Sequence, residues 1–310
     1  MIAATSDASL PVIQLAELSR RFGAKLALDK VNLSVPRGAV FGLVGANGAG
    51  KTTLIKHVLG LLRAQAGTVR VFGSDPTADP AGVLGRIGYL AEENDLPGWM
   101  RVAELLRYMQ AFYPGWDEAY AEELRQAFEL EPGARVKNLS KGQRARAGLV
   151  VALAHRPELL LLDEPSSGLD PIVRRDILGA IIRTIADEGR TVLFSSHLLH
   201  EVERVADKVA MINQGRVVFS GDLDDVKHTH RCLTLRFPQP RTAPPELVSV
   251  LAWEGTGCEW TALCGGLPSA IRDDAIRAGA SIVAERVPSL DEIFVARAGA
   301  RSTALATQED

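Results

Sequence analysis

The order of apolar and polar positions in the first 220 residues alternates between segments typical of strands and segments typical of helices. The run AVFGLVG at 39–45 reads as a buried strand ending in glycine, and the helical stretch KTTLIKHVLGLL at 51–62 follows it. LLLLD at 159–163 and TVLFSS at 191–196 are further apolar runs, each followed by a helical stretch. This alternation predicts an α/β domain.

The strand pattern is interrupted between residues 92 and 156. VAELLRYMQAFY at 102–113 and EAYAEELRQAFEL at 118–130 have helical spacing, and the breakers YPGW and EPGAR interrupt the helical pattern. We therefore predict an α-helical subdomain over about 92–156, inserted into the sheet domain.

The character of the chain changes again near residue 228. RCLTLRF at 231–237 alternates apolar and polar positions, a proline-rich connection follows, and later strand-like runs flank the helical stretch SAIRDDAIRAG. We predict a sheet domain over 11–228 and a small α+β appendage over 229–299. The two ends, 1–10 and 300–310, are expected to be disordered.

The composition is that of an ordinary globular protein, with 310 residues, 46% hydrophobic and 24% charged. A net charge of −3 gives no general attraction to nucleic acid, although it leaves local basic patches open. The first residues lack the basic start and apolar core of a secretory signal. The longest apolar runs are shorter than the roughly 20 residues of a membrane-spanning helix.

The cysteines are Cys232, Cys258 and Cys264, an odd number, all in the last part of the chain. This pattern suits reduced thiols of a cytosolic protein. Cys258 and Cys264 could ligate a metal, but no second Cys/His pair stands nearby at zinc spacing, so we expect ordinary packing.

The segment GANGAGKTT has the spacing G-x-x-x-x-G-K-[ST] and stands between a predicted strand and a predicted helix. Glycines let backbone N–H groups surround phosphate oxygens, and the helix N-terminus adds positive potential. Lys51 is expected to reach the β- and γ-phosphates of a nucleotide, and the Thr52 hydroxyl to bind Mg²⁺. The alternative is a glycine-rich turn without a ligand. The loop as a whole is the expected nucleotide site: Gly45, Ala46, Asn47, Gly48, Ala49, Gly50, Lys51, Thr52 and Thr53.

Two acids, Asp163 and Glu164, end the apolar run LLLLDE. An aspartate at the end of a buried strand beside a phosphate loop can hold Mg²⁺ directly or through water. Glu164 points differently and can polarise a water aimed at the γ-phosphate. The alternative is that both acids cap the helix after Pro165. The phosphate loop in the same chain favours the first interpretation.

With the phosphate loop, further motifs resemble those of the ATP-binding cassette (ABC) ATPases over about 13–220. LSKGQ at 139–143 resembles that family's signature, usually LSGGQ, and LLLLDEP resembles its Walker B strand with the catalytic glutamate. SSGLD at 166–170 resembles the D-loop, and SSH, ending at His197, resembles the switch histidine. The resemblance implies a P-loop NTPase sheet domain of ABC type that uses ATP and Mg²⁺, with Lys51, Glu164 and His197 as catalytic residues.

The stretch LSKGQ also predicts a helix start with a capping box. Ser140 and Gln143 have the spacing of a capping box at a helix start. The positive end of that helix, with Ser140 and the backbone N–H groups of Gly142 and Gln143, suits an anion. In the family that the motif resembles, the signature binds the ATP held by the other subunit. Lys141, where the family usually has glycine, adds a positive charge.

Two more site residues follow from the resemblance. Phe22 resembles the aromatic residue that stacks on adenine. Glu92, after IGYL, occupies the position of a glutamine that contacts Mg²⁺ and the attacking water. A carboxylate can also ligate Mg²⁺, and a shift of one residue to Glu93 remains open. The substitution leaves open how tightly this loop reports the nucleotide state.

The ending PSLDEIFVARAG and the text around Trp99 and GWDEAY are similar to ATPases of bacterial exporter-type transporters. The resemblance implies a cassette that pairs with an identical or homologous ABC ATPase at the cytoplasmic face of a bacterial membrane. Its partners would be integral membrane permease subunits, contacted near Trp99, and no nucleic acid is expected. The alternative is a soluble cassette acting on ribosomes or nucleic acid, but the chain shows neither two cassettes nor a coiled-coil insertion.

Overall fold

A computed structural model of the chain describes residues 10–93, 95–170, 172–175, 177–179, 189–247 and 249–297. The expected disordered ends lie, apart from Leu10, outside these residues. The described chain forms two compact units, one of residues up to Leu198 with Val205–Ser220, the other of Leu199–Arg204 with the chain from Gly221 on. The continuous part of the second unit begins at Gly221, a few residues before position 228, near which the pattern of apolar and polar residues changes.

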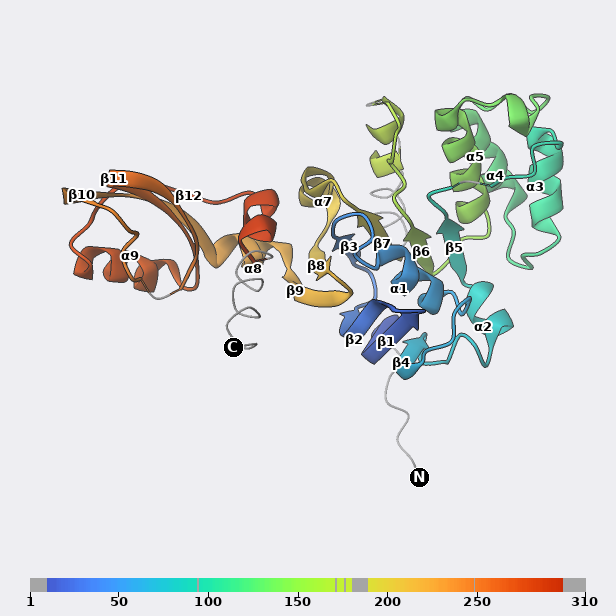
Figure 1. Ribbon diagram of the computed structural model, residues 1–310. Helices are drawn as coiled ribbons and strands as arrows, with labels where there is room; N and C mark the ends of the chain where they lie inside the picture. The colour runs from blue at the N-terminus through green and yellow to red at the C-terminus, as the bar shows by residue number, and fades with distance from the viewer. Residues whose placement is uncertain are drawn as a thin grey trace. The chain divides into compact units, whose positions relative to one another are not determined.

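A six-stranded sheet in the order β5-β6-β7-β3-β8-β9 forms the centre of the first unit (Figure 1). The strand pairs from β5 to β8 are parallel. The strands are β3 (Val40–Val44), β5 (Ile87–Leu90), β6 (Leu159–Leu162), β7 (Thr191–Ser196), β8 (Lys208–Asn213) and β9 (Arg216–Asp222). Every residue of β3, β6 and β7 is buried, as expected for parallel strands covered on both faces.

A second sheet of this unit is antiparallel, in the order β2-β1-β4. Its strands are β1 (Ile13–Phe22), β2 (Lys25–Val35) and β4 (Ala66–Val71). One hydrophobic core joins the two sheets to helix α1 (Lys51–Val58), with Leu28, Leu43 and Leu54 fully buried in it. This core holds the N-terminal end of α1 against the ends of the parallel strands.

The stretch predicted to be a helical subdomain contains α3 (Val102–Gln110), α4 (Glu118–Ala127) and α5 (Lys141–Leu153), which lie together in Figure 1. A short 3-10 turn, Val136–Asn138, precedes α5. Asp117 caps α4 by accepting a hydrogen bond from the Tyr120 N–H. The remaining named helix of this unit is α2 (Pro80–Leu84), whereas α7 (Leu199–Val205) belongs, apart from Val205, to the second unit.

The second unit is an antiparallel sheet in the order β11-β10-β12 with helices beside it. Its elements are α8 (Leu223–His228), β10 (His230–Arg241), β11 (Val250–Gly265), α9 (Pro268–Arg277), β12 (Ser281–Arg286) and a helix over 290–297. Leu233, Leu235, Trp260 and Ile271 belong to its own hydrophobic core. The strand-like runs ELVSVLAWE and EWTALC lie largely within β11, which folds back on itself. The Gly265 N–H donates to the carbonyl oxygen of Ser249 at 2.8 Å, and a Cβ on Gly255 would lie 2.5 Å from the carbonyl oxygen of Glu259. The two runs are therefore the two arms of an antiparallel hairpin.

Candidate nucleotide site

Four neighbouring parallel strands end at the same edge of the central sheet, and each is followed by residues of the predicted site. The phosphate loop follows β3, Glu92 follows β5, the acid pair follows β6, and His197 follows β7. The pairing of Val44 with Ser196 and of Leu162 with Phe194 keeps these strand ends level. The crevice at the carboxyl ends of such strands is where open α/β sheets bind ligands.

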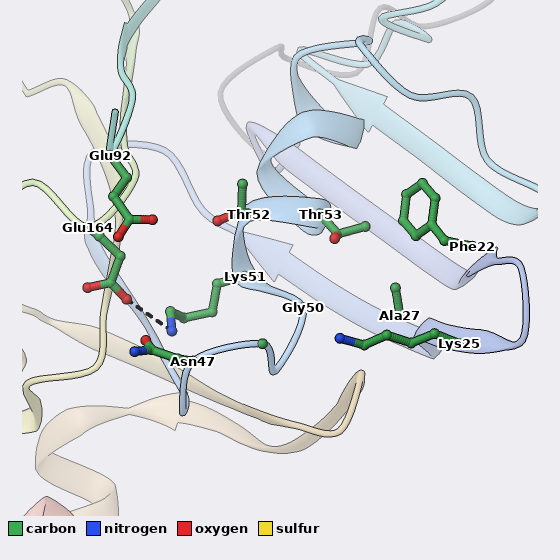
Figure 2. Close-up of a pocket in the computed structure, with 11 residues that line it drawn as sticks. Phe22, Lys25, Ala27, Asn47, Gly50, Lys51, Thr52, Thr53, Glu92 and Glu164 are labelled. Carbon is green, nitrogen blue, oxygen red and sulfur yellow. Dashed lines mark ion pairs between the residues drawn. The ribbon is translucent and has the colours of Figure 1, made fainter. Parts of the chain in front are cut away.

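A cavity of about 400 Å³ lies at this edge. Figure 2 shows Glu92 and Glu164 on one side of the phosphate loop and Phe22 with Lys25 on the other. Of the predicted nucleotide-binding residues, the cavity wall contains Phe22, Asn47, Gly48, Gly50, Lys51, Thr52 and Thr53.

Gly50 stands at the junction of the phosphate loop and α1. Its φ of 115° lies in the left-handed region, and a Cβ there would come 2.7 Å from the carbonyl oxygen of Ala27. Both observations restrict the position to glycine. The turn at Gly50 places Lys51 and Thr52 in the first turn of α1, where backbone N–H groups have no helical acceptor.

Lys51, Glu164 and His197 form a connected group of charged and polar side chains. Lys51 Nζ lies 3.0 Å from Glu164 Oε1, an ion pair between two side chains that are each 5% exposed. The same ammonium donates to the carbonyl oxygens of Gly45 at 2.6 Å and Ala46 at 3.2 Å. His197 Nδ1 lies 2.7 Å from Glu164 Oε2. Since a carboxylate only accepts, Nδ1 carries the proton in this hydrogen bond.

Asp163 is buried, and its Oδ1 accepts a 2.7 Å hydrogen bond from the hydroxyl of Ser195. The sequence did not single out Ser195, because within the motif SSH only the histidine has an expected role.

Tyr89, on β5, has a pKa that responds to the negative charges of this region. Burial, followed by the negative charges of Asp163 and Glu92, raises the pKa of its phenol to about 12. The two predicted metal ligands that follow β5 and β6 therefore both act on the proton of the Tyr89 phenol.

Phe22 is 45% exposed at the end of β1, and the guanidinium of Arg20 lies 4.8 Å from its ring centroid. A stacking position on the ring is compatible with this exposure. Lys25, on the next strand, is a second residue that the sequence reasoning missed. It lines the cavity, and its Nζ lies 3.9 Å from where a Cβ on Gly48 would be. Its position three residues after Phe22 is the signal that could have suggested it.

The signature residues do not line the phosphate-loop cavity. Ser140 begins α5 with the predicted capping box: the Gln143 N–H donates to Ser140 Oγ at 3.1 Å, and the Ser140 N–H donates to Gln143 Oε1 at 3.0 Å. Gly142 packs so closely that a Cβ would lie 2.7 Å from Val173 Cγ2. Its neighbour Lys141 extends toward Gly168 of SSGLD, where an added Cβ would lie 2.5 Å from Nζ.

A second cavity, of about 620 Å³, separates the signature from the acids. Lys141 and Arg144 line it together with Glu92, Glu93 and Glu164. Glu92 and Glu164 line both cavities, whereas Glu93 lines only this second one.

Three of the histidines that the sequence left as structural are buried: His57, His155 and His230. Burial lowers the pKa of each of them below the ordinary value of 6.5. His57 Nδ1 lies 2.8 Å from the carbonyl oxygen of Thr53, and His155 stacks on Tyr113. These contacts fit structural roles.

A phosphate loop beneath a paired lysine and glutamate, at the carboxyl edge of a parallel sheet, defines the class of P-loop nucleotide-binding proteins. A sequence profile described as "ABC transporter" matches residues 28–167. The ABC transporter ATP-binding protein NatA of Bacillus subtilis is 36% identical over 237 residues, covering 73% of this chain and 96% of that protein. The chain therefore belongs to the ATP-binding proteins of ABC transporters, a family of ATPases.

Two further comparisons agree with this family. The daunorubicin resistance ATP-binding protein DrrA3 of Streptomyces coeruleorubidus is 37% identical over 213 residues, which cover 67% of each chain. A solved structure titled "Structure of ATP binding subunit of ABC transporter" superposes with a TM-score of 0.64 at 31% identity, covering 70% of this chain and 92% of that one. The expected α/β fold of ABC type is confirmed.

Proposed function

We propose that this chain is the ATP-hydrolysing subunit of a bacterial export-type ABC transporter, acting through a separate integral membrane permease. The observation that carries the hydrolytic part is the Lys51–Glu164–His197 group beside the phosphate loop. Export is supported by the likeness to a daunorubicin resistance protein. The proposed permease partner places the chain at the cytoplasmic face of the membrane. No helix in the described part of the chain is long and apolar enough to cross a membrane.

The nucleotide would be held by the loop from Gly45 to Thr53, with adenine stacked on Phe22 and the phosphates on Lys51. Base stacking on an aromatic ring and a lysine at the phosphates are the usual means of holding ATP in such sites. Lys25, exposed at the wall of the same cavity, adds a second positive charge on the adenine side of the loop.

Thr52, Asp163 and Glu92 are the proposed Mg²⁺ ligands, directly or through water. Their donors are oxygens, which suit this ion. Among the described residues, no group of three or more His, Cys, Asp or Glu side chains has the arrangement of a metal site. When bound, Mg²⁺ neutralises charge on the β- and γ-phosphates.

Glu164 is the proposed general base. With its two oxygens engaged by Lys51 and His197, it is held at the phosphate loop before any nucleotide arrives. When the phosphates draw Lys51 away, Oε1 becomes available to accept a proton from water. The water oxygen then bonds to the γ-phosphorus, the bond to the bridging oxygen breaks, and ADP and phosphate result. His197 keeps the carboxylate oriented.

A second cassette, identical or homologous, would complete the site with its own signature. The start of α5, with Ser140, Gly142 and Gln143, would face the γ-phosphate held by the partner. In this chain alone these residues do not line the phosphate-loop cavity, which agrees with a role across an interface.

The permease would dock on the helical subdomain. Trp99 is 70% exposed and Phe112 is 60% exposed there, and aromatic side chains are enriched at protein–protein interfaces. Closure of the cassettes on ATP and opening on product release would then move the permease.

The test is purification of the tagged full chain from detergent-solubilised membranes of its host, with mass spectrometry of what co-elutes. We expect a multi-span membrane protein in stoichiometric amount. A matched Lys51→Ala preparation should retain this partner but lose ATP binding and hydrolysis. Recovery with ribosomes or nucleic acid, and without a membrane protein, would contradict the transport proposal. Unchanged ATP binding by Lys51→Ala would contradict the placing of the nucleotide.

A further inference from the structure

Ser195 lies beside Asp163, the proposed Mg²⁺ ligand, and Glu164, the proposed general base. It belongs to β7, and its side chain is fully buried. Because β7 pairs with β6 in parallel, with Leu162 opposite Phe194, Ser195 stands beside the first residue after β6, which is Asp163. Its hydroxyl makes two contacts there, one with each acid of the pair.

The direction of both hydrogen bonds is fixed by chemistry. The backbone N–H of Glu164 can only donate, so Ser195 Oγ accepts that bond, at 2.9 Å. The hydroxyl proton is then available for Asp163, whose Oδ1 lies at 2.7 Å. One hydroxyl therefore orients the carboxylate of Asp163 and the backbone of Glu164 at the same time.

Glu164 needs such support because its φ of 48° lies in the left-handed region, which is unfavourable for a residue with a Cβ. In this conformation its side chain reaches both Lys51 and His197. The Ser195 contact anchors the peptide at the residue where the chain turns.

We propose that Ser195 is a positioning residue for ATP hydrolysis, which holds Asp163 in the orientation for Mg²⁺ and Glu164 in the orientation for water. The proposal rests on the roles given above to these two acids. A merely structural serine would satisfy buried polar atoms and contribute to stability without affecting the chemistry.

The test compares full-chain wild type with Ser195→Ala and Ser195→Thr in steady-state ATPase assays. Loss of a group that orients metal ligands typically lowers activity or metal affinity about 10- to 100-fold. We expect Ser195→Ala to lower kcat by that factor and to raise the KM for Mg-ATP by about as much as the Mg²⁺-dependent affinity falls. Ser195→Thr retains the hydroxyl and should recover most of kcat.

A binding measurement separates positioning from activity. A fluorescent ATP analogue is titrated into each variant, once with Mg²⁺ and once with EDTA. Ser195→Ala should lose about tenfold in affinity with Mg²⁺, in the range expected for an outer contact of a metal site, and should be unchanged in EDTA.

Thr191→Val is the matched control. Thr191 is a buried residue at the other end of β7, and its hydroxyl accepts a 3.0 Å hydrogen bond from the Gly38 N–H. Its removal costs a comparable buried hydrogen bond far along the strand from the acids, so kcat should stay at the wild-type value. Ser195→Cys, a weaker hydrogen-bonding group of similar size, is assayed alongside in case Ser195→Ala does not fold.

The proposal is overturned if Ser195→Ala unfolds at a lower temperature yet keeps wild-type kcat and Mg²⁺-dependent affinity. It is also overturned if Ser195→Thr is as impaired as Ser195→Ala while folded. Glu164→Gln separates failure of the proposed catalytic role from failure of the proposal about Ser195. Normal turnover in Glu164→Gln would refute the proposed catalytic role itself, whereas an inactive Glu164→Gln beside a normal Ser195→Ala would refute only the inference about Ser195.

Discussion

At the scale of single residues, Glu164 is the buried acid that pairs with both Lys51 and His197. A buried carboxylate is costly unless it is paired, and here Lys51 and His197 pair it. The same lysine is the one expected on the phosphates, so ATP and Glu164 compete for it. Nucleotide binding therefore includes the separation of an ion pair that the structure already contains.

Glu164→Gln should leave ATP affinity unchanged or raise it up to about tenfold, roughly 1.4 kcal/mol. The neutral amide holds Lys51 less strongly, and one negative charge near the triphosphate is removed. Isothermal titration of ATP into wild type and variant measures this. Glu259→Gln, an exposed acid paired with Arg236 in the second unit, is the control and should bind as wild type. A clear loss of affinity in Glu164→Gln would contradict the competition.

The sequence predicted residues that belong to contiguous motifs, and the structure brings Lys51, Glu164 and His197 into contact. The sequence could not indicate the role of Ser195, because that role arises from the pairing of β6 with β7, which are distant in sequence. Ser195 lies 31 residues from Glu164 along the chain, yet its hydroxyl accepts the hydrogen bond of that residue.

At the scale of elements, the start of α5 shows how one segment can serve both folding and binding. The capping box of Ser140 and Gln143 satisfies two backbone N–H groups that the helix leaves without partners. The same N-terminus carries the partial positive charge proposed to face the phosphate of a second cassette.

Substitutions at Ser140 can separate these two roles. Ser140→Ala removes the cap and should lower the free energy of unfolding by about 1 kcal/mol. Ser140→Asp is an equally good cap but places a negative charge against the γ-phosphate. In a Glu164→Gln background, size-exclusion chromatography should show ATP-dependent dimers, which Ser140→Asp abolishes without loss of stability. Ser140→Asn, a neutral cap, is the control. Dimers of normal affinity with Ser140→Asp would count against the proposed interface.

The elements best predicted from sequence were those with a regular pattern, such as the fully apolar β6 and the helices of the 92–156 stretch. The antiparallel sheet of the first unit, β2-β1-β4, was not predicted. In β1 the pairing register with β2 shifts between Leu15 and Leu18 and again after Leu18, and such irregularities disturb the alternation that marks a strand. In β11 the chain turns back near Gly255 and Gly257, whose φ angles of 134° and 63° are open to glycine, so its two strand-like runs were recognised separately.

At the scale of the whole molecule, each compact unit has its own hydrophobic core. All residues proposed to contact the nucleotide come from the first unit. The tryptophans are divided between the units, with Trp99 and Trp116 in the first and Trp253 and Trp260 in the second. Fluorescence can therefore follow the units separately.

We expect the two units to unfold in separate steps in urea, and Mg-ATP to stabilise only the first. At a nucleotide concentration 100 times Kd, a ligand that binds only the folded state adds about 2.7 kcal/mol to its stability. The double variant Trp253→Phe/Trp260→Phe keeps only the tryptophans of the first unit. The midpoint of its fluorescence transition should shift to a higher urea concentration with Mg-ATP. Trp99→Phe/Trp116→Phe reports the second and should not shift. Lys51→Ala, introduced into the first reporter, should remove the shift. Coincident transitions that move together with nucleotide would instead mean that the two units unfold as one cooperative body.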